Sequence, residues 1–128
     1  MIENAGMDGT SIDQAIRSSA AFLHRTVDLD WDRPIPQMTW SVREVIAHVA
    51  DTLLWYATDL AGGPHELSTM DLRVRPAEAP AALIETVGTF GRVLGHVVDG
   101  VTPGQRGFHP DGAADSTGFA AMACDEIL

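Results

Sequence analysis

The sequence predicts an all-α fold, a four-helix bundle with one long crossover connection, organised as a single domain over residues 1–128. Three observations predict it. Apolar residues recur at helical spacing in four segments, and no segment alternates convincingly between apolar and polar residues. The third is a long stretch without a clean period, residues 64–79, which is expected to cross the bundle. With 128 residues and 45 % hydrophobic content, the chain can bury a core of its own.

The charge balance argues against several classes of partner. Eighteen acidic against eight basic residues give a formal net charge of −10, whereas nucleic acids and anionic membrane surfaces attract basic faces. We therefore expect neither nucleic-acid nor membrane partners. The single cysteine excludes an intrachain disulfide, and the N-terminal residues contain neither a basic region nor an apolar run. Because no apolar run approaches about 18 residues either, the sequence predicts a soluble cytoplasmic protein.

The first helix is expected to begin near Thr10 or Ser11, after a flexible lead-in of residues 1–9. The run from Ser11 to Gln14 has the spacing of a capping box. The predicted buried stripe comprises Ile12, Ala15, Ile16, Ser19, Phe22, Leu23 and, at its end, Val27. His24 lies beside this stripe and is expected at the surface.

Residues 28–40 form a connection, because Pro34 and Pro36 forbid a continuing helix. Four of its side chains are too apolar for an ordinary solvated loop, so we expect them to cover one end of the core. These are Trp31, Ile35, Met38 and Trp40.

The clearest helix spans residues 41–60. Ser41 can cap it while Glu44 reaches back to the Ser41 amide, which is the reciprocal pairing of a capping box. Its apolar face comprises Val42, Val45, Ile46, Val49, Leu53, Tyr56 and Leu60. His48 lies on the shoulder of that face, where an imidazole serves either as a ligand or as a partnered polar group.

The third helix is predicted from Pro80, a natural first helical residue, to about Gly100. Gly88, Gly91 and Gly95 lower its helix propensity by about 1 kcal/mol each relative to alanine. They would let a neighbouring backbone or a ligand come close, and close helix packing is the preferred explanation.

The last helix is predicted to follow a turn-rich segment and to be capped by Asp115 or Ser116. Phe119, Met122, Ala123 and Glu126 share one face in this register, so the Glu126 carboxylate points inward and needs a partner or a metal. The pattern stops at Leu128 in mid-helix, so we expect the last helix to be cut short.

Known catalytic motifs leave one candidate pair. The sequence contains no phosphate-binding glycine loop, no Gly-x-Ser-x-Gly elbow and no pair of Cys-x-x-Cys motifs. Acidic neighbours would raise the pKa of the Cys124 thiol, which argues against a nucleophile there. His48 and Glu126 remain, and from facing helices they would form either a hydrogen-bonded pair or part of a divalent-metal site.

Two stretches also carry a family resemblance. The first is Leu29-Asp30-Trp31-Asp32-x-Pro34-x-Pro36-x-x-x-Trp40-Ser41-Val42-Arg43-Glu44-x-x-x-His48-Val49-Ala50-Asp51. The second is Phe108-His109-Pro110-Asp111-Gly112-x-Ala114-Asp115-x-x-Gly118-Phe119-Ala120-Ala121-Met122-Ala123-Cys124-Asp125-Glu126. Together they resemble the DinB superfamily, and within it the actinobacterial branch of mycothiol-dependent maleylpyruvate isomerase N-terminal domains.

The resemblance implies a four-helix bundle that holds a divalent metal, zinc or nickel, through three residues. His48 corresponds to the ligand of the second helix, and Glu126 to the first member of a Glu-x-x-x-His pair on the last helix. The second member would fall two residues beyond Leu128, so the resemblance implies a truncated form with an incomplete site. The metal would hold a thiol cofactor, mycothiol in this branch, as a thiolate that attacks a small electrophile.

Two functions are therefore expected. The first is a metal-dependent thiol transferase or isomerase, impaired by the missing third ligand. The alternative is a non-catalytic helical bundle in which His48 and Glu126 pair or are buried. Such a protein would self-associate as a homodimer through its open apolar face. In that dimer the partner's His65, the partner's His96 or the partner's His109 could complete the site.

Overall fold

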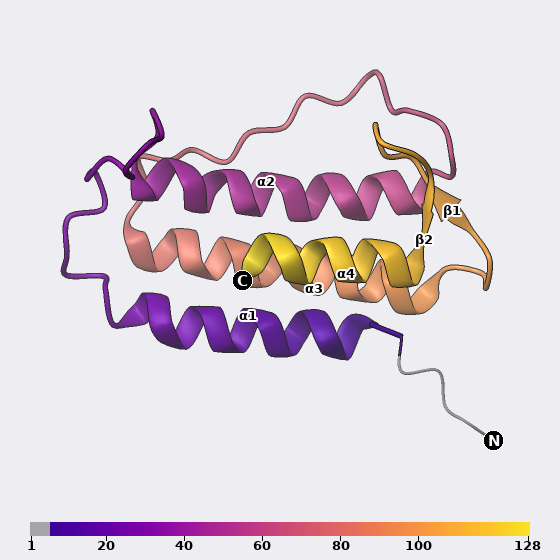
Figure 1. Cartoon of the computed structure of the whole chain (residues 1–128), viewed down its shortest axis with the longest axis horizontal. Coiled ribbons are helices and arrows are strands. Elements are labelled where there is room, and N and C mark those ends of the chain that lie inside the picture. The colour runs from indigo at the N-terminus through magenta and orange to yellow at the C-terminus, as the bar shows by residue number, and fades with distance from the viewer. Residues whose placement is uncertain (1–5) are drawn as a thin grey trace.

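The computed structural model describes residues 6–128 and contains four helices, which confirms the predicted all-α bundle (Figure 1). The helices are α1 (Gly9–His24), α2 (Val42–Ala61), α3 (Pro80–Gly100) and α4 (Ser116–Ile127). Two short strands, β1 (Arg106–Gly107) and β2 (Ala114–Asp115), pair as an antiparallel hairpin that the sequence pattern did not predict. Within residues 6–128 no helix is long and apolar enough to cross a membrane.

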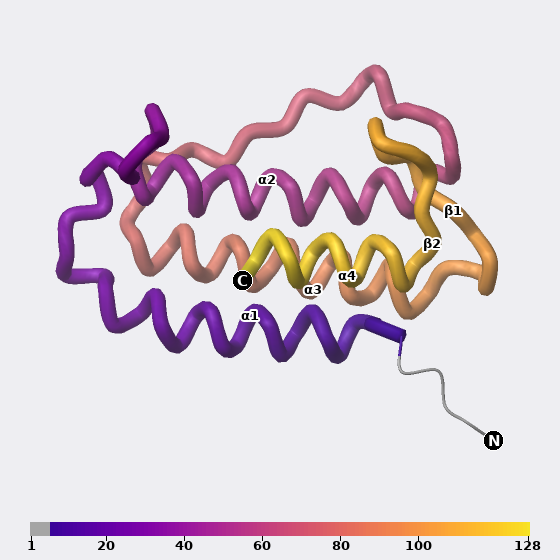
Figure 2. The backbone as a smooth tube through the Cα atoms, in the orientation of Figure 1, coloured from indigo at the N-terminus to yellow at the C-terminus, as the bar shows by residue number. Residues whose placement is uncertain are grey.

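The order of the helices in space explains the long connection. α1 runs antiparallel to α2, whereas α2 and α3 run in the same direction and pack against each other (Figures 1 and 2). The chain must therefore return along the whole length of α2 before α3 begins, and residues 62–79 do this, as expected. α4 is shorter than the others and ends near the middle of the bundle (Figure 1).

The helix starts follow local capping chemistry, with one correction. α1 was predicted to begin near Thr10 or Ser11 and begins at Gly9, and the predicted capping box from Ser11 to Gln14 is wrong. Asp8 is the N-cap: its carboxylate accepts the Ser11 N–H at 3.1 Å, and the Ser11 hydroxyl accepts the Asp8 N–H at 3.1 Å. Ser11 therefore holds the third helical position of the box rather than its first. The expected lead-in of residues 1–9 lies largely outside the described residues, and Asp8 and Gly9 belong to the helix start.

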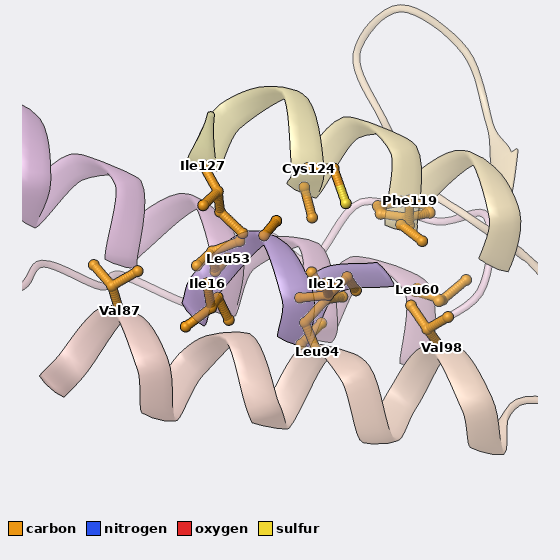
Figure 3. Packing of buried hydrophobic residues seen from close by; sticks show 14 of the residues in the cluster. Ile12, Ile16, Leu53, Leu60, Val87, Leu94, Val98, Phe119, Cys124 and Ile127 are labelled. Carbon is orange, nitrogen blue, oxygen red and sulfur yellow. The ribbon is translucent and has the colours of Figure 1, made fainter. Parts of the chain in front are cut away.

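A buried apolar cluster fills the middle of the bundle, where all four helices meet (Figure 3). Its largest fully buried side chains include Phe119, Ile12, Leu53, Leu60 and Leu94. A second cluster lies beyond the end of α4, where Trp31 packs with Ala47, Leu83 and Ile84. The connection before α2 thus covers the part of the core that α4 does not reach.

Of the four apolar side chains expected to cover this end of the core, only Trp31 is fully buried. It is 2 % exposed, whereas Met38 and Trp40 are 48 % and 38 % exposed and Ile35 is half-buried. Phe22, predicted in the buried stripe of α1, is 55 % exposed. Ile12, Ala15 and Ile16 are buried, whereas Leu23 and Val27 of the predicted stripe are only half-buried and pack against the second cluster.

The hairpin closes one end of the bundle against the last turn of α2. A Cβ added at Gly107 would lie 2.5 Å from the Leu60 Cα and 2.7 Å from the Asp59 carbonyl oxygen, so only glycine allows this approach. The Gln105 amide donates to the Leu60 carbonyl at 2.9 Å, and the Phe108 N–H donates to the Gly63 carbonyl at 3.1 Å. The hairpin thereby satisfies carbonyl groups at the C-terminal end of α2.

Candidate functional site

The predicted site residue His48 lies nearly two turns into α2, and the capping box sets where this helix starts. Ser41 and Glu44 form that box as predicted: the Ser41 N–H donates to Glu44 Oε1 at 3.0 Å, and the Glu44 N–H donates to the Ser41 hydroxyl at 3.4 Å. Hydrogen bonds from the Ser41 amide and then from its hydroxyl lower the pKa of Glu44. Trp40, just before the cap, is thereby held against the first turns of the helix.

His48 itself is exposed, with two contacts that orient its ring. The Trp40 and His48 rings meet edge to face, with centroids 4.9 Å apart. On the other side, His48 Nε2 lies 3.5 Å from the Thr52 hydroxyl, and that hydroxyl donates to the His48 carbonyl at 2.9 Å. The imidazole is therefore positioned by neighbours of its own helix and stays accessible from outside.

A cavity of about 390 Å³ opens beside this ring, between α2 and the crossover segment. Its lining combines an aromatic side chain, an imidazole, two carboxylates and two guanidinium groups. It comprises Trp40, Glu44, Ala47, His48, Asp51, Arg73, Val74, Arg75 and Pro76. Cavities of this size accommodate small organic molecules.

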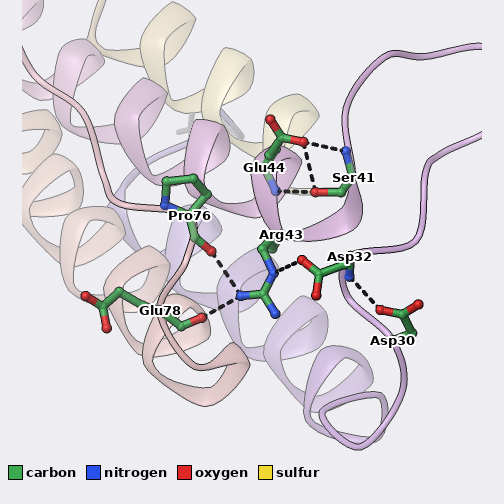
Figure 4. A network of polar contacts seen from close by, with 7 residues as sticks. All are labelled: Asp30, Asp32, Ser41, Arg43, Glu44, Pro76 and Glu78. Carbon is green, nitrogen blue, oxygen red and sulfur yellow. Dashed lines mark hydrogen bonds and ion pairs between the residues drawn. The ribbon is translucent and has the colours of Figure 1, made fainter.

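Two side chains of α2 hold the crossover in place as the outer wall of the cavity. Asp51 Oδ1 accepts the Val74 N–H at 2.5 Å. The Arg43 guanidinium donates to the carbonyl oxygens of Pro76 at 3.0 Å and Glu78 at 2.7 Å (Figure 4). Arg43 also pairs with Asp32 at 2.8 Å, so it connects the segments before and after α2.

The charges around the cavity are not equally available. Glu44 is engaged by Ser41 and Asp51 by the crossover backbone, so both carboxylates have structural roles. Arg75 forms an exposed ion pair with Glu78 at 3.4 Å, and Arg73 forms no hydrogen bond or ion pair within the described residues. The cavity therefore presents an imidazole and cationic groups to a ligand.

Glu126, the second predicted site residue, lies on α4 and does not line the His48 cavity. It is half-buried on α4, and Ile127 takes the fully buried position next to it. Burial first, and then the carboxylates of Glu126, Asp125 and Asp59, raise the pKa of Tyr56 on α2. The charge of Glu126 therefore acts on Tyr56 of α2, which lies about two turns beyond His48.

The structure does not join the two predicted residues directly. Within residues 6–128 no hydrogen bond or ion pair connects His48 with Glu126, and Glu126 does not line the His48 cavity. In the same range, no three His, Cys, Asp or Glu side chains lie close enough together to hold a metal ion. The pair by itself does not amount to a metal centre.

Sequence reasoning missed two parts of the site. Arg73 and Arg75 are two residues apart in an extended segment, a spacing that places both side chains on one side of the chain and could have identified them. Asp51 follows His48 by almost one turn and therefore lies on the same face of α2. Cys124 is buried, and burial, not its acidic neighbours, raises the pKa of its thiol.

Comparison with known proteins yields one match. The family model described as mycothiol maleylpyruvate isomerase N-terminal domain matches residues 12–127. No curated protein matches the chain, and no solved structure matches it.

Proposed function

Because the chain belongs to the mycothiol maleylpyruvate isomerase N-terminal domain family, we propose that it binds a thiol of the mycothiol type and brings it into reaction with a small electrophile. The observation that carries this proposal is the cavity of about 390 Å³ beside His48. It is formed around the start of α2, the stretch in which the sequence resembles the family most clearly.

The proposed reaction is addition of the thiol to the electrophile. The thiol loses its proton, the sulfur forms a C–S bond to an electron-poor carbon of a double bond, and the displaced electron pair moves onto the conjugated acceptor group. Protonation of this adduct completes S-transfer. Rotation about the former double bond, followed by C–S cleavage, gives cis–trans isomerisation and returns the thiolate. Both outcomes require a group that takes the thiol proton, because the thiolate is the nucleophile.

We assign proton acceptance to His48, the imidazole in the cavity wall. Imidazole is the commonest general base in enzymes. The Thr52 hydroxyl donates its proton to the His48 carbonyl, so its oxygen faces Nε2 as an acceptor. This contact favours the tautomer with the proton on Nε2 and leaves Nδ1 free to accept one. The edge of Trp40 limits rotation of the ring.

As the alternative to proton acceptance by His48, we propose that His48 and Glu126 are the two ligands that this chain contributes to a divalent cation, zinc or nickel; an imidazole bound to the cation does not accept the thiol proton. Such a cation would supply thiolate stabilisation when bound. Residues 6–128 place no third ligand with them, and catalytic zinc ordinarily has three protein ligands. No step of the proposed reaction is therefore routed through a metal, and impaired metal-dependent activity belongs to the proposal.

The test uses His48→Ala with His65→Ala as the matched control, since His65 is exposed and lies outside the cavity. The wild-type chain should accelerate addition of mycothiol to N-ethylmaleimide, and His48→Ala should reduce this acceleration roughly a hundredfold, within the range of general-base contributions. His65→Ala should match the wild type. Equal rates for the wild type and His48→Ala would refute the assignment. Metal content is measured for the purified wild type, His48→Ala and Glu126→Ala. Equal metal content in all three proteins would refute the ligand proposal.

A second candidate function, a non-catalytic bundle that acts by self-association, is supported by a different observation. Several large apolar side chains are exposed, including Phe22 at 55 % and Leu29 at 66 %. Phe22 lies in the last turns of α1 and Leu29 in the connection that follows, and neither lines the His48 cavity. Apolar groups gathered at one place on a surface are typical of interaction sites.

A further inference from the structure

An apolar groove of about 370 Å³ lies between the C-terminal end of α1 and the connection that follows it. We call it the α1-end groove. It is lined by Phe22, Leu23, Thr26, Leu29, Asp30, Trp31, Arg33 and Val42. It shares no lining residue with the His48 cavity.

The groove has an apolar floor and protruding apolar edges. Trp31 forms the floor at 2 % exposure, and its one polar atom, Nε1, donates to the Thr26 carbonyl at 3.0 Å. The floor therefore presents no unsatisfied polar group. Phe22 and Leu29 stand at its edges at 55 % and 66 % exposure. The groove therefore lies beside two protruding side chains, Phe22 and Leu29, and the same side chains of a second copy of the chain could fill it.

Charges of both signs belong to this part of the surface. Asp30 and Arg33 line the groove, and the Asp30 carboxylate accepts the Asp32 N–H at 2.9 Å. Arg25 and Asp28 lie in the same segment of the chain. Within the described residues, neither Arg25 nor Arg33 forms an ion pair, although the chain has 18 acidic residues. The Arg25 guanidinium lies over the Phe22 ring, 5.8 Å from its centroid. Asp28, in the same segment, is exposed and has no hydrogen-bonded or ionic partner in that range. An acidic partner could form ion pairs with the two arginines but not with Asp28. A basic partner could pair with Asp28 but not with the arginines.

A second copy of the chain satisfies both. In a two-fold symmetric interface the same patch meets itself, so a cation of one protomer faces an anion of the other and a protruding side chain enters the facing groove. We propose that the chain forms a two-fold dimer through the α1-end groove, with Phe22 of each protomer in the groove of its partner. This deepens the second candidate function by naming its surface and does not depend on the thiol chemistry.

The test measures the mass of the whole chain by sedimentation and light scattering at tens of micromolar. The wild type should be a dimer. Phe22→Ser should weaken association roughly a hundredfold, because symmetry removes two aromatic side chains from one interface. Val93→Ser is the matched control: it removes an apolar side chain of 39 % exposure on α3, outside the groove, and should leave the dimer unchanged. Arg33→Glu, whose side chain has no ionic partner within the chain, should also weaken the dimer.

The outcomes distinguish two claims: that the chain forms a dimer, and that the dimer forms through the α1-end groove. A monomeric wild type would overturn both, and would leave the groove to another occupant. A dimer that persists in Phe22→Ser and Arg33→Glu, both verified as folded by circular dichroism, would overturn the surface while self-association through another face survives.

Discussion

Two glycines of α3 provide a sharp test of how closely α1 and α3 pack. Gly88 and Gly91 are both buried in the same helix, and alanine has the higher helix propensity at either position. They differ in what a new Cβ would meet. At Gly88 the nearest atoms are 3.7 Å and 3.9 Å away, which is ordinary contact. At Gly91 the Cβ would overlap Ile16 Cδ1 and lie 3.1 Å from Ile16 Cγ1.

The magnitude follows from two opposing effects. Alanine gains about 0.8–1.0 kcal/mol over glycine in a helix interior, so Gly88→Ala should stabilise the protein by about that amount. Overpacking a core costs about 1–3 kcal/mol. Rotation about χ2 of Ile16 can move Cδ1 away but not Cγ1, and the χ1 of isoleucine in a helix is stiff. Gly91→Ala should therefore be less stable than Gly88→Ala by about 1–3 kcal/mol.

Urea unfolding monitored by circular dichroism at 222 nm measures both variants on one scale. Since both changes add the same group to the same helix, differences in denatured-state entropy cancel to first order. Equal stabilisation by the two substitutions would refute the reasoning, because it would mean that α1 does not approach α3 at Gly91.

Two further predictions concern the walls of the candidate site. Arg43→Gln should lower the free energy of unfolding in urea by about 1–3 kcal/mol, because the Arg43 guanidinium donates charged hydrogen bonds to the Pro76 and Glu78 carbonyls. Limited proteolysis should also cut the crossover faster in this variant. An unchanged cleavage rate would contradict this prediction. The pKa of Glu44 is lowered by Ser41 from its ordinary 4.5, so its charge contributes stability that is full above that value and is lost as pH falls through the lowered one. The difference in thermal stability between the wild type and Glu44→Gln should therefore be constant above about pH 5 and should close as the pH falls through the lowered pKa, whereas a difference that stays constant with pH would exclude the effect.

Several elements could be predicted because their signals are local. The capping box of Ser41 and Glu44 needs residues three apart and nothing else, and α2 begins where the sequence placed it. The same rule failed at α1, because Asp8 and Ser11 take the two roles in the reverse of the usual residue types. The hairpin was missed because strands of two residues are too short to show any alternation.

The candidate site was predictable only in part. Helical period was taken to place His48 on the shoulder of the apolar face, which is wrong: the buried residues of α2 are Ala47, Ala50, Leu53, Ala57 and Leu60, and His48 lies exposed on the other side of the helix. The family resemblance gave His48 a role. The period did not show that an extended segment with Arg73 and Arg75 lies over it, since that depends on hydrogen bonds made by Arg43 and Asp51 across more than twenty residues of chain. Glu126 was expected inward, yet Ile127 holds the buried position.

By itself, the sequence determined four helices, their order, the capping of α2 and the family to which the chain belongs. The tertiary structure decided which side chains become neighbours: Trp31 in the core while Trp40 stays outside, His48 beside the crossover, and Glu126 near Tyr56. The physical reason is that helical period sets the direction of a side chain around its own axis, whereas the offset of one helix along another depends on packing of the whole bundle.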